Sequence, residues 1–301
     1  MDHSDSAGKV SPEPRRAAGG AQLAPGLYFI ATPIGAARDI TLRALDILRD
    51  ADVIAAEDTR TLRHLMDIHG VALAQRPMIP YHDHNGETAR PRILRALEEG
   101  KSVVYASEAG TPLVADPGYQ LGRAAIAAGL PVHAAPGPSA VLAALTVSGL
   151  PSDRFLFAGF PPNTKSARQK WLRGFAQIPA TLVFYESPKR VREMLADAVQ
   201  EFGEMRQAAL CRELTKRFEE VRRGTLSDLA AGLETAPVKG EVVVLVDRPH
   251  ERAVSTEDME TALRARLAHM SVKDAATEVA EVLGLPRREV YQAALALDRE
   301  D

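Results

Sequence analysis

Short apolar runs alternate with amphipathic segments through the first half of the chain. The runs have the length and composition of buried strands, and each is followed by a polar turn and a helical pattern. Strands are predicted at residues 27–31, 52–56, 78–81, 102–106 and 131–135. The first helix is predicted to begin after a cap, Asp39 or Thr41, and to run through Arg49. Five such alternations of strand and helix indicate a largely parallel sheet.

The stretch 102–118 has the most polar of the loops that follow these strands. It starts as a strand and breaks into Gly, Pro, small residues and two carboxylates, Glu108 and Asp116. Asp116 followed by Pro117 predicts a helix N-cap with proline at the first helical position. In an open α/β sheet, the loop at the carboxyl end of a strand is where ligands bind. We therefore expect a ligand site here.

The second half of the chain predicts another α/β region and then a helical tail. Residues 148–151 form a natural joint, after which strands are predicted at 155–158, 180–185, 207–211 and 241–246, with helices between them. From residue 256 the pattern is purely helical, with helices predicted at 256–267, 272–283 and 287–297. A tight turn before the last helix is typical of a helix-turn-helix unit. The fold class is therefore predicted as α/β, with domains at 25–148 and 149–250 and a small all-α, helix-turn-helix-like tail at 255–301.

Composition narrows the class of protein. A chain of 301 residues with 46% hydrophobic content is long enough to fill two cores, whereas residues 1–24 are predicted to be a disordered tail because they lack apolar periodicity. A single cysteine, Cys211, excludes an internal disulfide framework, and no Cys/His cluster has zinc-ligand spacing, so we expect no metal. No apolar run approaches the ~20 residues of a membrane helix, and the N-terminus lacks the charged segment followed by an apolar segment that is typical of a signal peptide. We expect a cytoplasmic protein with no membrane partner.

Three loops at the ends of predicted strands share one composition. Residues 32–35, 107–112 and 136–139 each combine proline with glycine or other small residues, which let a ligand approach the backbone closely. None of them is a dinucleotide-binding G-x-G-x-x-G loop or a Walker A loop. Three such loops at one sheet edge predict a pocket for a nucleotide-like ligand without a pyrophosphate.

These loops belong to a longer succession of motifs. In chain order they are Ala31-Thr32-Pro33-Ile34-Gly35, Ala56-Glu57-Asp58-Thr59-Arg60, Tyr81-His82-Asp83-His84-Asn85, Ser107-Glu108-Ala109-Gly110-Thr111-Pro112, Asp116-Pro117-Gly118, Pro136-Gly137-Pro138-Ser139-Ala140, Ser148-Gly149-Leu150-Pro151, Tyr185-Glu186-Ser187-Pro188 and Arg212-Glu213-Leu214-Thr215-Lys216. The succession covers residues 27–247 and resembles the ribosomal RNA small subunit methyltransferase I family, in the tetrapyrrole-methylase-like superfamily.

The resemblance implies two α/β domains of the tetrapyrrole-methylase type, an open cleft between them that binds S-adenosyl-L-methionine as the cofactor, and a homodimer. The implied reaction is 2′-O-methylation of a cytidine in the decoding region of 16S rRNA, with the small ribosomal subunit as partner and no DNA. By carry-over, the residues that line the methyl-donor site are Pro33, Gly35, Ser107, Glu108, Ala109, Gly110, Thr111, Pro112, Asp116, Pro136, Gly137, Ser139, Tyr185, Glu186 and Arg212.

Four positions depart from the family's usual pattern. Ala36, Glu108, Ala115 and Lys189 stand where Asn, Asp, Ser and His are usual. Glu108 keeps the negative charge of aspartate but reaches further by one methylene. The departures therefore concern the details of donor contact and leave the reaction class unchanged.

Methyl transfer to a ribose hydroxyl needs alignment of the reacting atoms and a group that accepts the hydroxyl proton or stabilises the alkoxide. The catalytic candidates are Glu57, Asp58, Arg60, His82, His84, Glu213 and Lys216. Lys216 is either a base, with its pKa lowered by Arg212 and Arg217, or a charged phosphate contact, and we favour the second role. The two histidines share a face if their stretch is extended, or are ordinary surface residues. The alternative for Glu57, Asp58 and Arg60 is that they pair with one another.

Charge is unevenly distributed, although the net charge of −3 indicates no general affinity for nucleic acid. Residues 151–224 contain fourteen Lys/Arg and nine Asp/Glu, an excess that suits an RNA backbone or belongs to ordinary solvated helices. The predicted RNA contacts are Lys165, Arg168, Lys170, Arg173, Lys189 and Arg190. Residues 251–301 contain eleven acids and seven bases, so this tail suits nucleic acid less well and docks on the subunit or packs on the core.

Two rival functions are open at this point. A methyltransferase of the same fold that acts on a tetrapyrrole or another non-RNA acceptor predicts an uncharged, apolar cleft. A DNA-binding regulator that uses the tail predicts a basic exposed face on helix 287–297.

Overall fold

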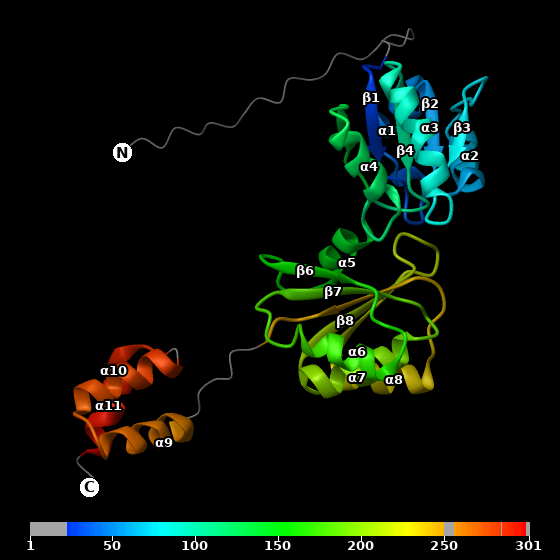
Figure 1. Ribbon diagram of the computed structural model, residues 1–301. Coiled ribbons are helices and arrows are strands. Elements are labelled where there is room, and N and C mark those ends of the chain that lie inside the picture. Colours follow the sequence, from blue (N-terminus) through cyan, green and yellow to red (C-terminus); the bar gives the residue numbers. More distant parts are fainter. Residues whose placement is uncertain (1–22, 250–255, 284, 299–301) are drawn as a thin grey trace, which may run out of the picture. The chain divides into compact units, whose positions relative to one another are not determined.

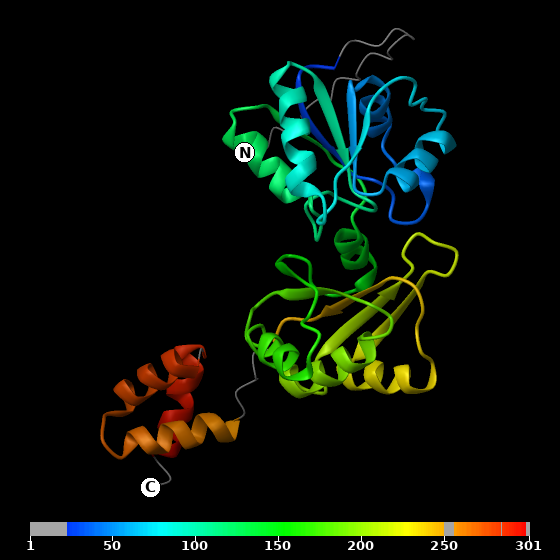
Figure 2. The same cartoon turned by 45° about the vertical axis from the view of Figure 1, so that its right-hand side comes forward.

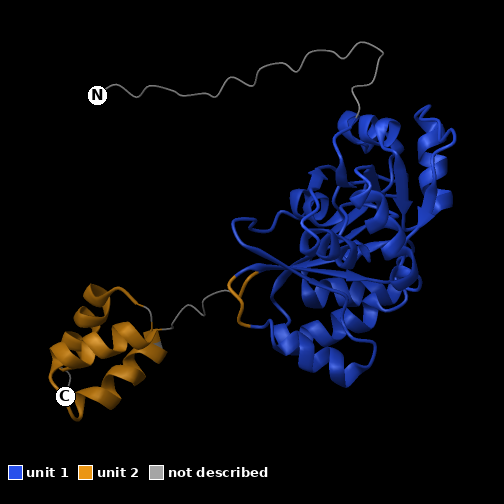
Figure 3. Cartoon of the chain, turned by 45° about the horizontal axis from the view of Figure 1, so that its top comes forward, with its two compact units in different colours: residues 1–176, 180–247 blue, residues 177–179, 248–301 orange. Residues whose placement is uncertain are grey.

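The computed structural model describes residues 23–249, 256–283 and 285–298 (Figures 1 and 2). Nearly all of the predicted tail over 1–24 lies outside the described residues. The chain divides into two compact units (Figure 3). The first holds the described residues up to Asp247 except 177–179, and the second holds 177–179 and the described residues from Arg248 onward.

The first sheet of unit 1 is parallel throughout, as predicted. Its strands are β1 (Gly26–Ile30), β2 (Val53–Ala56), β3 (Met78–Pro80), β4 (Ser102–Ala106) and β5 (Val132–Ala135), in the order β3-β2-β4-β1-β5. The helices between them are α1 (Leu42–Asp50), α2 (Thr59–Ile68), α3 (Gly86–Glu98) and α4 (Gly118–Ala127). Of the two predicted caps of α1, Thr41 is correct, because its hydroxyl accepts the Ala44 N–H at 3.1 Å. Asp39 lies in a short 3₁₀ turn, Ala37–Asp39.

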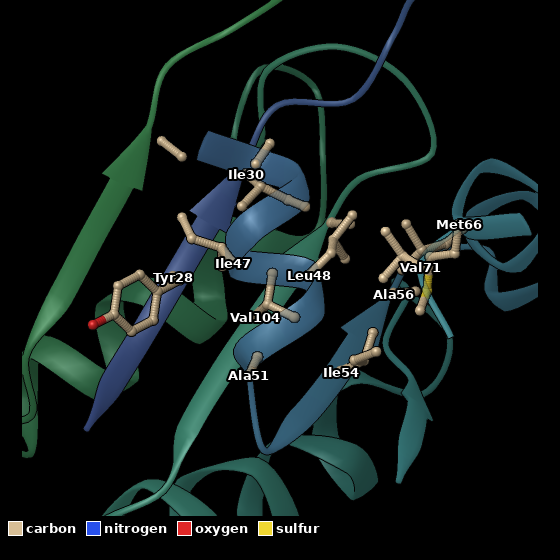
Figure 4. Close-up of a cluster of buried hydrophobic side chains, with 14 of the residues drawn as sticks. Tyr28, Ile30, Ile47, Leu48, Ala51, Ile54, Ala56, Met66, Val71 and Val104 are labelled. Atoms are coloured by element: carbon tan, nitrogen blue, oxygen red, sulfur yellow. The ribbon is translucent and has the colours of Figure 1, made fainter. Parts of the chain in front are cut away.

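Helices cover both faces of this sheet, which explains why its central strands are apolar without interruption. On one face, Tyr28 and Ile30 of β1 and Val104 of β4 pack with Ile47 and Leu48 of α1 (Figure 4). The alternate residues of the same strands pack on the other face with α3 and α4. The carboxyl ends of the strands are thereby held in one rigid edge.

The second sheet of unit 1 is mixed. Its strands are β6 (Phe155–Gly159), β7 (Thr181–Glu186), β8 (Gln207–Arg212), β9 (Glu220–Thr225) and β10 (Val242–Val246), in the order β6-β7-β10-β8-β9. Only the β6–β7 pair is parallel. The four predicted strands are present, and β9 was missed because its residues are mostly polar, as is usual at a sheet edge.

Helices also cover this second sheet. Helix α5 (Ala140–Ser148) packs on one face, while α6 (Lys165–Arg173), α7 (Val191–Phe202) and α8 (Leu226–Thr235) lie along the other (Figures 1 and 2). Cys211 of β8 is fully buried under α5, and this burial raises the pKa of its thiol to about 11.

The second unit consists of three helices with the predicted bounds, α9 (Thr256–Leu267), α10 (Val272–Leu283) and α11 (Arg287–Leu297). Leu263, Val279, Val290, Ala294 and Leu297 form a core of its own. No helix in the described part of the chain is both long and apolar enough to cross a membrane. The described residues also contain no group of three His, Cys, Asp or Glu side chains placed to hold a metal ion.

Candidate functional site

The loops after β1, β4 and β5 meet at the carboxyl edge of the first sheet. Thr32 and Gly110 exchange two backbone hydrogen bonds, from Thr32 N to Gly110 O at 2.9 Å and from Gly110 N to Thr32 O at 3.0 Å. The Thr111 hydroxyl donates to the Pro138 carbonyl at 2.8 Å, which ties in the third loop. Because β1 lies between β4 and β5, the three loops predicted to form a pocket are neighbours.

The first of these loops also contacts the turn between β8 and β9. Ala36 N donates to Thr215 Oγ1 at 3.1 Å. A Cβ atom added to Gly35 would lie 2.5 Å from Lys216 Cγ and 3.0 Å from the Leu214 carbonyl oxygen. Only glycine allows this approach, so residues from both sheets enclose the space between them.

A cavity of about 640 Å³ lies between these walls, a size typical of ligand sites. Ten of the predicted donor-site residues line it: Pro33, Gly35, Glu108, Ala109, Gly110, Thr111, Asp116, Ser139, Tyr185 and Glu186. The other five lie behind the walls or beside them: Ser107, Pro112, Pro136, Gly137 and Arg212. The sequence motifs therefore converge on one cavity.

The residues outside the lining shape the loops. The buried Ser107 hydroxyl donates to the Gly110 carbonyl at 3.1 Å and so closes its own turn. Gly137 packs against Ala31, where a Cβ atom would lie only 3.0 Å from the alanine methyl. Arg212 forms an ion pair with Glu220 at 3.1 Å, which turns its charge away from the cavity.

Many of the residues that line the cavity were not predicted as site residues. The additional lining residues are Ile34, Thr61, Val114, Ala115, Ala140, Phe160, Ser187, Pro188, Gly240, Glu241, Val242 and Val243. Signals in the sequence were available for some of them, since Ile34, Ala140, Ser187 and Pro188 belong to quoted motifs and Phe160 comes two residues after a predicted strand. Residues 241–243 were predicted only as the start of a strand, and no sequence signal placed residues 240–243 at the site.

Five carboxylates give the cavity a negative potential: Glu57, Glu108, Asp116, Glu186 and Glu241. The lining contains no Lys, Arg or His among the residues that the structure describes. Glu186 pairs with Arg190 at 3.2 Å, and Glu241 pairs with Lys216 at 3.0 Å. Three carboxylates lack such partners, so the cavity suits a ligand with positive charge.

Glu57 and Asp116 form an interacting pair of carboxyl groups on the cavity wall. Glu57 Oε2 accepts the Glu108 N–H at 2.9 Å. Asp116 Oδ1 accepts from the Tyr105 hydroxyl at 2.9 Å and from Gly118 N at 2.6 Å, while its buried Oδ2 has no hydrogen-bond partner among the described residues. Burial raises the pKa of Glu57, and the negative charge of the neighbouring Asp116 carboxylate raises it further. Glu57 therefore holds a proton more readily than an isolated carboxylate.

The same loop corrects the predicted start of α4. The helix begins at Gly118, with Pro117 as the cap residue. The prediction placed Pro117 at the first helical position, one residue further into the helix. Asp116 nevertheless accepts the Gly118 N–H, as a capping side chain does.

Backbone strain gathers in two loops beside the cavity. Leu113 and Ala115 have φ angles of 71° and 56°, and Glu213 and Thr215 have φ angles of 50° and 62°. Among the described non-glycine residues only Ala74 also has a positive φ. Each such residue costs about 1–3 kcal/mol and is found most often at functional sites.

Of the seven catalytic candidates, Glu57 alone lines the cavity. Asp58 caps α2, since its carboxylate accepts from Arg60 N at 2.7 Å and from Thr61 N at 3.2 Å. The Arg60 side chain is exposed and lies 3.6 Å from the Asp58 carboxylate. The alternative that these three residues pair with one another therefore holds for Asp58 and Arg60 but not for Glu57.

The remaining candidates lie outside the lining. His82 and His84 follow β3 with ring centres 6.1 Å apart. The Glu213 carboxylate accepts from Glu241 N at 2.9 Å and from Lys216 Nζ at 3.1 Å. Burial alone would lower the pKa of Lys216, but the hydrogen bonds that its ammonium donates to Glu241 and Glu213 raise the pKa above the ordinary value. Lys216 is therefore held in its charged form, against the alternative of a lysine base.

Two predicted RNA contacts face inward. The prediction for Arg168 is wrong, because its guanidinium is only 2% exposed and pairs with the buried Asp197 at 2.7 Å. Arg190 donates to the carbonyls of Pro161 and Pro162 at 2.7 and 3.0 Å and pairs with Glu186, so its charge is used internally. The other four predicted contacts are exposed side chains: Lys165, Lys170, Arg173 and Lys189.

Comparison with protein families gives two matches. Residues 26–230 match the family described as Tetrapyrrole (Corrin/Porphyrin) Methylases. Residues 253–298 match the RsmI C-terminal HTH domain. Together these matches cover the first sheet, the second sheet except β10, and the described helical tail.

Curated relatives resemble the chain over most of its length. A ribosomal RNA small subunit methyltransferase I from Mesorhizobium japonicum is 48% identical, over 91% of this chain and 93% of the relative. A protein of the same name from Xylella fastidiosa is 44% identical, over 88% of this chain and 97% of the relative.

Solved structures share the fold at low sequence identity. A cobalt precorrin-4 methyltransferase is 19% identical with a TM-score of 0.56, covering 73% of this chain and 94% of that chain. A uroporphyrin-III C-methyltransferase from Thermus thermophilus, complexed with S-adenosylhomocysteine, is 22% identical with a TM-score of 0.51, covering 74% of this chain and 97% of that chain.

Proposed function

The chain belongs to the ribosomal RNA small subunit methyltransferase I family, an S-adenosylmethionine-dependent class of rRNA methyltransferases, and we propose that it methylates the 2′-hydroxyl of a cytidine in the decoding region of 16S rRNA. We further propose that it works in the cytoplasm as a homodimer, with the small ribosomal subunit as its partner and with domains at 25–148, 149–250 and 255–301. The helical tail is proposed to take part in RNA methylation and not to bind DNA.

The charge of the cavity is the observation that carries this proposal. S-adenosylmethionine has a sulfonium and an ammonium group, and the three lining carboxylates without a cationic partner, Glu57, Glu108 and Asp116, provide the matching potential. The volume of about 640 Å³ is sufficient for a nucleoside of this size. A tetrapyrrole acceptor, which carries several carboxylates itself, would meet repulsion here, and the rival function predicted an uncharged cleft.

Some residues of this chain bind the methyl donor, and another removes a proton from the acceptor. When bound, S-adenosylmethionine supplies an electrophilic methyl group on a sulfonium. The three glycine- and proline-containing loops would approach the ligand closely, and Glu108 would contribute negative charge beside it. Glu57 would accept the proton of the ribose 2′-hydroxyl on its carboxylate when the methyl group is transferred. Asp116 raises the basicity of Glu57, and the proton later passes to solvent.

The test uses 30S subunits purified from cells that lack this methylation. The protein, incubated with subunits and methyl-labelled donor, is expected to leave label in 16S rRNA, and nuclease digestion with mass spectrometry should identify 2′-O-methylcytidine. Label on a base, or no label in 16S rRNA while a precorrin accepts methyl groups, would overturn the proposal.

Gly35→Ala is expected to weaken donor binding. The added methyl group would overlap Lys216 Cγ and crowd the Leu214 carbonyl, forcing the two walls of the cavity apart. Overpacking of this kind costs about 1–3 kcal/mol, so the donor Kd should rise roughly tenfold in isothermal titration calorimetry.

Gly232→Ala is the matched control. Gly232 lies in α8 with no neighbour within 4 Å of an added Cβ, so the same change should leave the donor Kd unaltered. Equal donor affinity for the Gly35 variant and the control would show that this contact does not shape the site.

A further inference from the structure

Phe160 is exposed at the rim of the donor cavity. Its side chain is 56% exposed, and it is the one large hydrophobic residue, among the described residues of the lining, that is exposed rather than packed. The apolar residues deeper in the cavity, such as Val242 and Val243, are buried. An exposed aromatic ring beside a binding site gains stability only when a ligand covers it.

The chain holds Phe160 in this position with three devices. The pairing of β6 with β7 shifts register between Phe157 and Gly159, and Gly159 has a φ of 78°, so the strand bends just before Phe160. The Tyr185 ring packs edge-on against it, with ring centres 5.5 Å apart. Arg190 fixes the following segment through the carbonyls of Pro161 and Pro162. The ring is therefore oriented before any ligand arrives.

The surroundings of the ring select what can cover it. The three lining carboxylates without a cationic partner, Glu57, Glu108 and Asp116, repel a phosphate group. A nucleobase is uncharged and presents a flat π-face, which stacks favourably on phenylalanine whatever its identity. Lys165 and Lys189 are exposed on the segments next to Phe160 and Arg190, where they can meet the phosphates of the same strand.

We propose that Phe160 is the stacking surface for the base of the nucleotide that is methylated, an inference that rests on the proposed function in RNA. Stacking at the rim places the attached ribose over the cavity, where the donor and Glu57 lie. The residue thus selects an unpaired nucleotide rather than a duplex, because the base must leave its own stack to reach the ring.

Three variants test this role: Phe160→Ala, Phe160→Trp and Phe155→Ala. Phe155 lies at the other end of β6, is 44% exposed and does not line the donor cavity, so it controls for loss of a surface phenylalanine. Donor affinity is measured by calorimetry with S-adenosylmethionine alone, and kcat and KM are measured with 30S subunits.

Phe160→Ala is expected to raise KM for the subunits by roughly five- to 150-fold, as for other base-stacking residues, with the donor Kd and the thermal midpoint unchanged. Phe160→Trp should stay within a few-fold of wild type, and Phe155→Ala should match it. Parallel weakening of donor binding in Phe160→Ala would assign the ring to the donor's adenine and overturn the proposal, as would wild-type kinetics in that variant. If wild type leaves no methyl group on 16S rRNA, the proposed function itself fails and this inference fails with it.

Discussion

Glu57→Gln should lower kcat by about 10²–10⁴-fold, the usual contribution of a general base, while the donor Kd changes little. Glutamine keeps the size of the side chain and can still accept the Glu108 N–H, so the wall of the cavity is preserved. What it cannot do is accept the hydroxyl proton. Single-turnover methylation of 30S subunits, with saturating donor, measures the loss.

The pH profile of the wild type gives an independent reading of the same group. Glu57 acts as a base only when ionised, so the rate should fall as the pH falls through its pKa. Because burial and the Asp116 carboxyl raise that pKa, the fall should occur at higher pH than for an ordinary glutamate. Glu57→Gln should lose this dependence, and the matched change Glu87→Gln, at an exposed site on α3, should not. Full activity of Glu57→Gln would remove Glu57 from the mechanism.

Arg168→Ala should lower the free energy of unfolding of unit 1 by about 3–5 kcal/mol. Arg168 and Asp197 are both buried, and removal of one partner leaves an uncompensated charge in the core. Trp171, the only tryptophan of the chain, lies in the same helix, so its fluorescence during urea denaturation measures this loss.

Arg173→Ala is the control for that experiment. Arg173 is on the same helix and pairs with Glu201 at 2.9 Å, but its side chain is 70% exposed, so its removal should leave the free energy of unfolding nearly unchanged. The double change Arg168→Met with Asp197→Leu should recover much of the stability, because no buried charge is then left unpaired. An Arg168→Ala variant with wild-type stability and a raised KM for subunits would restore its predicted role as an RNA contact.

The parts of the fold that were predicted are those with a strong period. The strands of the first sheet are buried on both faces and read as continuous apolar runs, and the tail helices have clear apolar stripes between turns. Strand β9 has neither property, since Glu220, Arg222 and Arg223 make it polar. Because β9 was not predicted, the β8–β9 hairpin could not be predicted either, nor could the antiparallel pairing in the second sheet.

The candidate site shows the same division. The three loops of the first sheet were found because all its strands are parallel and end at one edge. The opposite wall includes the start of β10, because Val242 pairs with Glu186 and with Arg212 at the ends of antiparallel neighbours. The rule that ligands bind at strand ends can be applied to those residues only when the directions of the strands are known.

The choice of base also needed the structure. Glu57 and Asp58 are adjacent and chemically alike, so the sequence offers no ground for separating them. In the structure one faces the cavity and the other caps α2. Arg168 was misjudged for a related reason, because a count of charges along a helix does not show which of them has a buried partner.

The buried thiol of Cys211 has a practical consequence for labelling chemistry. It is the chain's single cysteine, and with a pKa of about 11 and no exposure it remains protonated and out of reach of maleimides at neutral pH. A cysteine introduced at an exposed position, such as Ser166→Cys on α6, will therefore carry a fluorophore or spin label alone. The wild-type sequence is already a suitable background for such probes, with no native residue to remove.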